Sequence, residues 1–238
     1  MRSDRIKKTL QDARFLCKAL FKPYKLGELD VLSLTRVILS FCLAASWMAT
    51  GLAFASNQDM VDAAKKQIGV TTVYDPAYVQ IAFPGGDVPA GRGVCTDVVI
   101  RAMRLAKRID LQAAINADMR ARPSAYPKKW DLTHPATDPH IDHRRVPNQM
   151  VYFEKQGYKL PLASGVSAYR AGDIVAWNLK PSGLKHIGII SDKKSGDGTP
   201  WVIHNIGRGT QEENILLEHE LIGHYRVTQP LPKHPPVK

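Results

Sequence analysis

The sequence predicts an exported α+β domain in which several short helices precede an antiparallel sheet. The chain has 238 residues, of which 44% are hydrophobic, enough to fill one ordinary core but not two full domains. Helix-like apolar stripes occur before residue 157, and three runs rich in β-branched residues follow, joined by short turns. With 17 glycines, 16 prolines and no long internal repeat, the chain is neither a solenoid, a coiled coil nor a disordered protein.

Residues 1–55 have the pattern of a targeting segment. All nine of their Lys and Arg side chains lie before position 37, and an uncharged run extends from Val37 to Phe54. The run closes on Ala53-Phe54-Ala55, a small-x-small pattern, so we expect cleavage after Ala55. The run is also long enough to span a bilayer, and the alternative is an uncleaved inner-membrane anchor. In both cases the positive-inside rule places residues 56–238 in the periplasm or another extracytoplasmic space.

The exported part contains one cysteine, Cys95, because Cys17 and Cys42 lie in the targeting segment. An unpaired thiol in an oxidising compartment is either a small buried hydrophobic residue or a functional group. Gly91 and Gly93 precede Cys95, and an apolar stripe after it predicts a helix: Val98, Val99, Ala102, Met103 and Ala106. At the start of a helix the backbone N–H groups lower a thiol pKa, so we expect an activated nucleophile.

Two of the eight histidines lie inside the strand-like runs, which cover residues 172–177, 185–192 and 201–207. His186 begins the second run and His204 lies within the third. A strand can hold an imidazole opposite the start of a helix, and a polar group on the next strand can then orient its ring. The alternative is that both are structural histidines at a sheet edge.

These residues resemble a known family. The glycine loop, Cys95 and the motifs GDIVAW, HIGII and VIHN, in that order, resemble the NlpC-type cell-wall peptidases, the bacterial branch of the papain-like cysteine hydrolases. The segments VTTVYDPAYV, FPGGDVPAGRGVCTDVVIRA, HRRVPN and VIHNIGRGTQEE resemble an exported bacterial family catalogued as domain of unknown function 1287, over most of residues 59–227. The resemblance implies a papain-like fold, with the nucleophile helix packed on an antiparallel sheet.

The NlpC resemblance also implies catalytic roles. Cys95 is the nucleophile, His186 the base and His204 the orienting residue, while Asn205 is the alternative because papain-type enzymes use an asparagine there. Side chains alternate along a strand, so only one of residues 204 and 205 can share a face with His186. The sequence departs from the NlpC pattern at Val94, where aspartate is usual, at Thr96, where serine is usual, and in the gap of about 90 residues between Cys95 and His186.

Two further groups of residues are candidates for substrate binding. A tyrosine upstream of the nucleophile lines the cleft of NlpC-type enzymes, which suggests Tyr74 or Tyr78, with simple packing as the alternative. A Pro- and His-rich insertion over about 120–146 carries cations and aromatic residues that could form a rim for an anionic ligand or a solvated loop: Tyr126, Lys128, Lys129, Trp130, Arg144 and Arg145. Export and a net charge of only +6 for residues 56–238 argue against nucleic acid.

The remaining segments have simpler interpretations. We expect short helices over residues 59–68, ended by Gly69, over 111–119, capped by Asp110, and from Pro147 to a stop at Gly157. Residues 230–238 are expected to be a disordered tail. The insertion contains His and Asp side chains, but its prolines exclude a helical HExxH zinc site, and we predict no metal.

The sequence thus predicts a papain-like hydrolase domain over residues 56–229. It would hydrolyse an amide, in the peptide stem of peptidoglycan or another envelope peptide, through a thioester on Cys95, with the oxyanion held by N–H groups at the helix start. This chemistry needs no cofactor, and membrane contact is expected only through residues 37–54 if they are retained. The alternatives are a non-catalytic envelope module that binds cell-wall glycopeptide and a metal-dependent cell-wall hydrolase that uses the insertion histidines.

Overall fold

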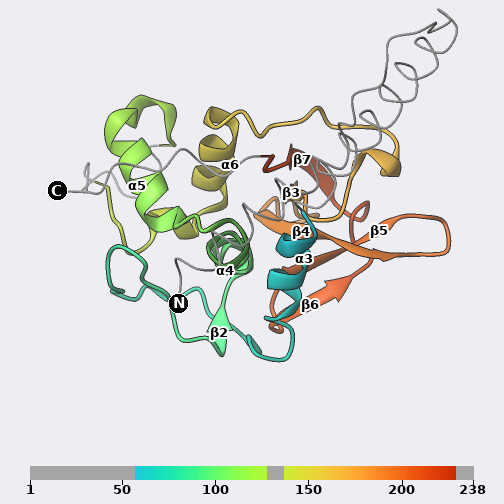
Figure 1. Ribbon diagram of the computed structural model, residues 1–238, viewed down its shortest axis with the longest axis horizontal. Coiled ribbons are helices and arrows are strands. Elements are labelled where there is room, and N and C mark those ends of the chain that lie inside the picture. The colour runs from blue at the N-terminus through green and yellow to red at the C-terminus, as the bar shows by residue number, and fades with distance from the viewer. Residues whose placement is uncertain (1–56, 128–136, 229–238) are drawn as a thin grey trace, which may run out of the picture. The chain divides into compact units, whose positions relative to one another are not determined.

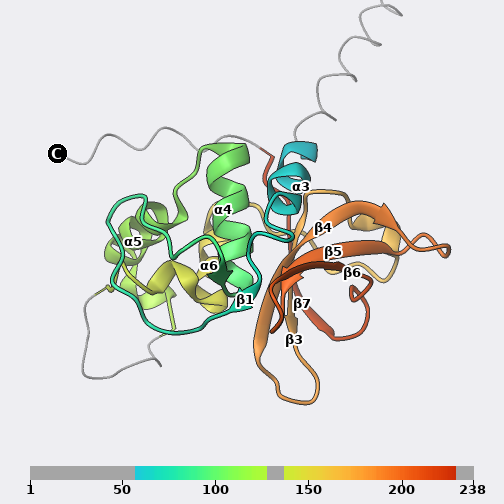
Figure 2. The same cartoon turned by 90° about the horizontal axis from the view of Figure 1, so that it is seen from below.

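A five-stranded antiparallel sheet forms one layer of the protein, and α3 (Gln58–Lys65) and α4 (Cys95–Lys107) pack beside it (Figures 1 and 2). The computed structural model describes residues 57–127 and 137–228. The predicted targeting segment, the tail and Lys128, Lys129 and Trp130 of the predicted rim lie outside these ranges. Within the ranges, no helix is both long and apolar enough to cross a membrane.

The sheet follows the order β6-β5-β4-β3-β7. Its strands are β3 (Ile174–Asn178), β4 (Lys185–Lys194), β5 (Pro200–Asn205), β6 (Thr210–Glu213) and β7 (Glu220–Tyr225). The three runs predicted as strands are thereby confirmed as β3, β4 and β5, three neighbours in the sheet. A separate parallel pair, β1 (Val73–Tyr74) with β2 (Arg92–Gly93), precedes α4.

The predicted helices are also present. Asp110 caps α5 (Leu111–Ala121) by accepting the Gln112 N–H at 3.2 Å, and Pro147 lies in the first turn of α6 (Val146–Lys155). Gly69 and Gly157 adopt positive φ angles shortly after α3 and α6, as expected for residues that end helices. Short 3₁₀ turns occur at Pro123–Ala125, Asp142–Arg144 and Val166–Ala168.

Strand alternation divides the interior into two cores on opposite faces of the sheet. On the helical face, Ile187 and Ile189 of β4 join the larger core, which contains Cys95 and the apolar stripe of α4. On the other face, Ile190 joins a smaller core with Trp177 and other side chains from the segment before β3, from β3, from β5 and from the β6–β7 connection: Tyr169, Val175, Val202 and Leu216. The mixed helix and sheet content confirms the α+β class.

Candidate functional site

Cys95 is the first residue of α4, as predicted, because Val94 before it has an extended backbone and the stripe of α4 is buried from Val98 to Met103. The side chain is only 5% exposed. Its sulfur is stabilised by the backbone N–H of Ile187 on β4, together with those of Thr96 and of Cys95 itself. The thiol therefore meets β4 at the residue that directly follows His186.

Burial dominates the ionisation of this thiol. Removal from water raises the pKa of Cys95 to about 12, and the nearby carboxylate of Asp97 adds to the increase. The three N–H groups oppose it but do not outweigh it. The predicted lowering of the pKa of Cys95 is thus the wrong direction for the structure, because the amide dipoles at a helix start act locally while the surrounding core desolvates the thiolate.

A buried ion pair fixes the start of α4. Asp97 accepts the Val94 N–H at 2.7 Å and two bonds from the guanidinium of Arg144, both at 2.9 Å. Arg144 also donates to the carbonyl oxygens of Asp75 and Ala77, each at 3.3 Å. The side chains of Arg144 and Asp97 are 2% and 3% exposed. Arg144, expected on a surface rim, instead ties the insertion to the start of α4.

His186 and His204 form the centre of the site. His186 Nε2 lies 3.0 Å from His204 Nδ1, with the two rings nearly perpendicular at 88°. The indole of Trp177 stacks on His186 with ring centroids 5.7 Å apart. Position 188 of β4 requires a glycine, because a Cβ there would lie 3.1 Å from the Cβ of His204 and 2.8 Å from Cγ1 of Val202 on β5.

The second nitrogen of His204 faces a carboxylate. Its Nε2 lies 3.1 Å from Glu213 Oε2, within ion-pair distance but not aligned as a hydrogen bond, and among the described residues this nitrogen has no hydrogen-bond partner. Glu213 lies on β6 directly opposite Val202 of β5, which puts it on the same face of the sheet as His204. Arg208, from the turn before β6, pairs with this carboxylate. Three side chains from three neighbouring strands are thereby connected in sequence.

Both imidazoles are neutral near pH 7. Burial lowers the pKa of His186 to about 3, and repulsion from His204 and His219 adds to the decrease. Burial likewise lowers the pKa of His204 to about 4, although Glu213 opposes the change. A neutral imidazole carries one N–H and one lone pair, so each ring can donate on one side and accept on the other.

Asn205, the alternative orienting residue, points to the other face of the sheet. Its Nδ2 donates to the carbonyl oxygen of Gly93 at 3.0 Å, and its Oδ1 accepts the Gly207 N–H at 3.3 Å. The structure therefore brings His204, and not Asn205, to the ring of His186. Cys95 and His186 form no direct hydrogen bond in the described residues, and the ring nitrogen that His204 leaves available is His186 Nδ1.

The other predicted binding residues are spread over the loops around α4. Tyr74 is 37% exposed, and Cys95 is one of the neighbours that raise its pKa after burial itself, so it lies near the thiol. Tyr78 is 53% exposed and donates to Asp138 at 3.0 Å. Arg145 is half-buried, and burial lowers its pKa. Tyr126, expected at the rim, is buried and donates to Asp118 at 2.6 Å.

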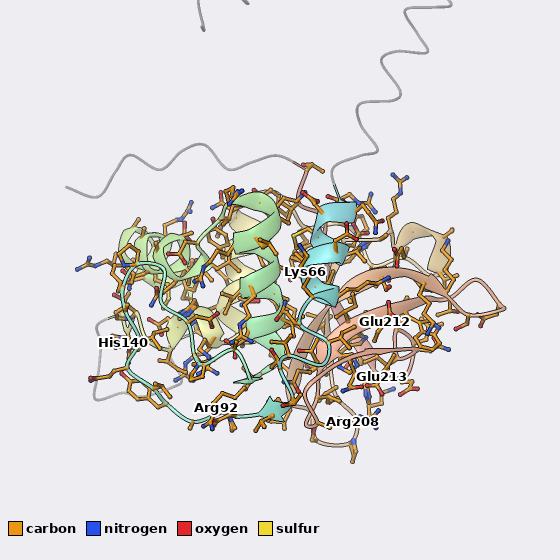
Figure 3. All side chains as sticks on the ribbon, turned by 60° about the horizontal axis from the view of Figure 1, so that its bottom comes forward. Lys66, Arg92, His140, Arg208, Glu212 and Glu213 are labelled. Atoms are coloured by element: carbon orange, nitrogen blue, oxygen red, sulfur yellow. The ribbon has the colours of Figure 1, made fainter. Side chains whose placement is uncertain are left out.

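The described residues contain no group of three or more His, Cys, Asp or Glu side chains that could hold a metal ion. Of the insertion histidines, His140 bonds through Nδ1 to the backbone of Ile81, and His143 is buried. Figure 3 shows His140 on the helical side of the domain, apart from Arg208, Glu212 and Glu213. A pocket of about 360 Å³ lies beside His204 and Glu213, lined also by Arg208, Glu218 and His219.

Comparison with known proteins assigns the chain to a family. A family model described as "Domain of unknown function (DUF1287)" matches residues 61–227. The chain belongs to this family. The chain is also similar to a protein named "Uncharacterized protein YijF" from Escherichia coli (strain K12), with 52% identity over 171 residues, covering 72% of this chain and 82% of that protein. The stretch shared with the family contains every residue of the site, from Tyr74 to Glu213.

Three features of this site were not predicted from the sequence. Glu213 received no role, although a hairpin from β5 through the glycines at 207 and 209 would have placed a carboxylate near His204. The pairing of Arg144 with Asp97 joins residues 47 positions apart, and no local pattern indicates it. The stacking of Trp177 on His186 follows from the β3–β4 register, in which the two residues are direct partners.

Proposed function

We propose that this protein is an exported cysteine hydrolase of papain-like, NlpC-type fold that cleaves an amide bond in peptidoglycan stem peptides. The observation that carries the proposal is the position of Cys95 at the start of α4, with its sulfur against the N–H of Ile187, the residue that follows His186. His204 lies 3.0 Å from the ring of the proposed base, His186, so α4, β4 and β5 each contribute one of the three proposed groups. The predicted export signal and the NlpC resemblance favour a cell-wall substrate.

The chemistry starts from a neutral pair, because the thiol has a raised pKa and the imidazole a lowered one. As the sulfur of Cys95 attacks the amide carbonyl carbon, His186 Nδ1 takes the thiol proton. The oxyanion of the tetrahedral intermediate is held by backbone N–H groups at the start of α4. The ring of His186 stacks on Trp177, on the face of the sheet opposite the core that contains Cys95, so this mechanism requires the ring to reach the thiol when the substrate binds.

The intermediate then collapses in two stages. His186 gives its proton to the leaving nitrogen, so the C–N bond breaks, an amine departs and a thioester remains on Cys95. Water next attacks the thioester while His186 Nδ1 accepts a proton from it. The C–S bond breaks, the sulfur takes the proton back from His186, and a carboxylic acid leaves. No electrons are transferred to or from an external acceptor, and no cofactor enters either stage.

One observation favours a second function. Cys95 is 5% exposed and its thiol is not bonded to His186, while the pocket beside His204 and Glu213 is open to solvent on the other side of the pair. A non-catalytic module that binds cell-wall glycopeptide would need no access to the thiol. The two functions differ in whether a covalent bond of the cell wall is broken.

The test is incubation of the full chain with purified sacculi, followed by mass spectrometry of the released muropeptides. The proposal requires a new amine and a new carboxylate in a stem peptide. Cys95→Ala should abolish them, whereas the matched cysteine variants Cys17→Ser and Cys42→Ser should retain the activity. EDTA should have no effect. Sacculi that are bound but not cleaved would establish the binding module, and loss of activity with EDTA with recovery on added zinc would establish a metal-dependent enzyme.

A further inference from the structure

Three side chains form a continuous chain of contacts that leads away from the nucleophile. His186 Nε2 is 3.0 Å from His204 Nδ1, and His204 Nε2 is 3.1 Å from Glu213 Oε2. Both imidazole side chains are almost entirely removed from solvent, whereas 24% of the Glu213 side chain is exposed. Three of the four ring nitrogens thus have one defined neighbour each, and the position of one proton affects the next.

The carboxylate of Glu213 determines the direction of these hydrogen bonds. An ionised carboxylate only accepts, and its other oxygen pairs with the guanidinium of Arg208. A carboxylate oxygen 3.1 Å from Nε2 attracts an N–H and repels a lone pair, so it favours the tautomer of neutral His204 with the proton on Nε2 and a lone pair on Nδ1. That lone pair accepts from Nε2 of His186, so the lone pair of His186 is on Nδ1. This nitrogen is the one that must take the thiol proton.

The opposite arrangement of protons is unfavourable in two ways. A proton on His204 Nδ1 would leave the lone pair of Nε2 facing a carboxylate oxygen at 3.1 Å in a buried setting. It would also force His186 to accept at Nε2 and to carry its proton on Nδ1. A base with its proton already on Nδ1 cannot deprotonate Cys95.

The β5–β6 register turns Glu213 toward His204 and turns its neighbour Glu212 to the opposite face of the sheet. Glu213 pairs with Val202 in the β5–β6 register, while Glu212 pairs with Ile203 and belongs to the helical face, where it accepts from Ser191 and lies 3.5 Å from Lys65. Figure 3 shows both carboxylates side by side on the sheet, with Arg208 near Glu213. The two glutamates therefore have equal charge and adjacent positions, but only one faces the histidines.

We infer that Glu213 is a positioning residue of this site: its carboxylate sets the tautomers of His204 and His186, which prepares Nδ1 of His186 to accept the proton of Cys95. The inference rests on the proposed function, because it gives the two histidines their roles as orienting residue and base. It extends the catalytic group by a fourth member that touches neither substrate nor thiol.

The tautomers can be measured directly by ¹⁵N NMR of the full chain labelled at histidine, with signals assigned through His186→Gln and His204→Gln. In the wild-type protein both rings should carry their proton on Nε2. Glu213→Met removes the acceptor at similar side-chain length, and it should shift His204 toward the Nδ1–H form. The control Glu212→Gln removes one charge from the same strand and should leave both tautomers unchanged.

Cleavage of purified sacculi provides the second readout. The rate should fall about 10- to 100-fold in Glu213→Met, as is typical when the group that orients a functional histidine is lost. Glu213→Gln should recover part of this loss, because its amide oxygen can still accept from His204 Nε2. Glu212→Gln should stay within about twofold of the wild-type rate, since its side chain faces away from His186 and His204.

The outcomes separate this inference from the proposed function. A wild-type His204 that carries its proton on Nδ1 overturns the inference, and so does a Glu213→Met protein with unchanged tautomers; the wild-type measurement needs no variant to fold. Tautomers that depend on Glu213 in a protein that does not cleave sacculi would support the positioning role and reject the hydrolase. Sacculus cleavage unaffected by Glu213→Met would reject the positioning role and leave the hydrolase standing.

Discussion

The side-chain amide of Asn205 donates to the carbonyl oxygen of Gly93 at 3.0 Å, which ties β5 to the turn that precedes α4. His204, one residue earlier, turns to the other face and contacts His186. Two neighbouring residues of β5 thus serve the site in different ways. One fixes the position of the turn before Cys95, and the other contacts the ring of His186, the proposed base.

The first prediction compares the loss of activity or stability when His186, His204 or Asn205 is replaced by alanine. His186→Ala should lower amide hydrolysis by about 10²- to 10⁴-fold, because both thiol deprotonation and leaving-group protonation depend on it. His204→Ala should cost less, and His204→Gln should recover part of the loss by bonding the ring. Asn205→Ala should act mainly on stability, by about 1 kcal/mol, since it removes one buried hydrogen bond. Sacculus cleavage and denaturant unfolding measure the two effects.

A larger loss of activity in Asn205→Ala than in His204→Ala, with both variants folded by circular dichroism, would reverse the assignment. Full activity in His186→Ala would reject the cysteine–histidine mechanism as a whole.

The second prediction concerns the reactivity of Cys95. Because burial raises its pKa to about 12, iodoacetamide should label native Cys95 at pH 7 more slowly than a free thiol, whose pKa is about 8.5. The labelling rate should keep rising with pH above 9, where a free thiol has reached its plateau. Peptide mapping separates Cys95 from Cys17 and Cys42, and the same peptide in urea provides the control. Fast labelling of the native protein at pH 7 would instead show an activated thiolate.

The third prediction is a loss of stability in acid caused by His186 and His204. Their pKa values are about 3 and about 4 in the folded protein, against 6.5 for a histidine side chain in water. The unfolded chain binds more protons in this interval, so the free energy of unfolding should fall as pH decreases from 6.5 to about 4. Each unit of pKa difference corresponds to about 1.4 kcal/mol.

Urea unfolding of the wild-type protein and of the double variant His186→Gln/His204→Gln measures this dependence. The double variant should show a weaker pH dependence over the interval, whereas His140→Gln, remote from the pair, should retain that of the wild type. An equally steep fall in the double variant would place the titrating groups elsewhere.

The fourth prediction concerns the ion pair at the start of α4. Arg144→Met should lower the free energy of unfolding by about 3–5 kcal/mol, because it leaves the carboxylate of Asp97 buried without its partner. Arg92→Met is the matched control. Its guanidinium is 53% exposed in the pair with Asp75, so the cost there should be below about 1 kcal/mol.

The added change Asp97→Asn in the Arg144→Met protein should recover part of the stability, since an amide is less costly to bury than an unpaired charge. Equal costs for Arg144→Met and Arg92→Met would show that the buried pair does not stabilise α4.

Several helices and strands could be predicted from the sequence, because the patterns that specify them lie within a few neighbouring residues. The glycine turn and the apolar stripe after Cys95 indicate where α4 begins, since helix period and turn chemistry are expressed within a few residues. The β-branched runs around His186 and His204 likewise predict β4 and β5. The polar strand β6, Thr210–Glu213, gives no such signal, because it forms through pairing with β5 rather than through its own composition.

Other features follow only from the folded protein, because they depend on contacts between residues far apart in the sequence. The direction of the pKa change at Cys95 follows from the core that closes over it, and this burial outweighs the helix-start amides that the sequence reveals. Arg144 was expected at the surface because it lies in a charged loop, but the fold turns it inward to Asp97. Glu213 reaches His204 only through the register of β5 and β6. Burial and register are properties of the assembled sheet and core, so residue order alone does not determine them.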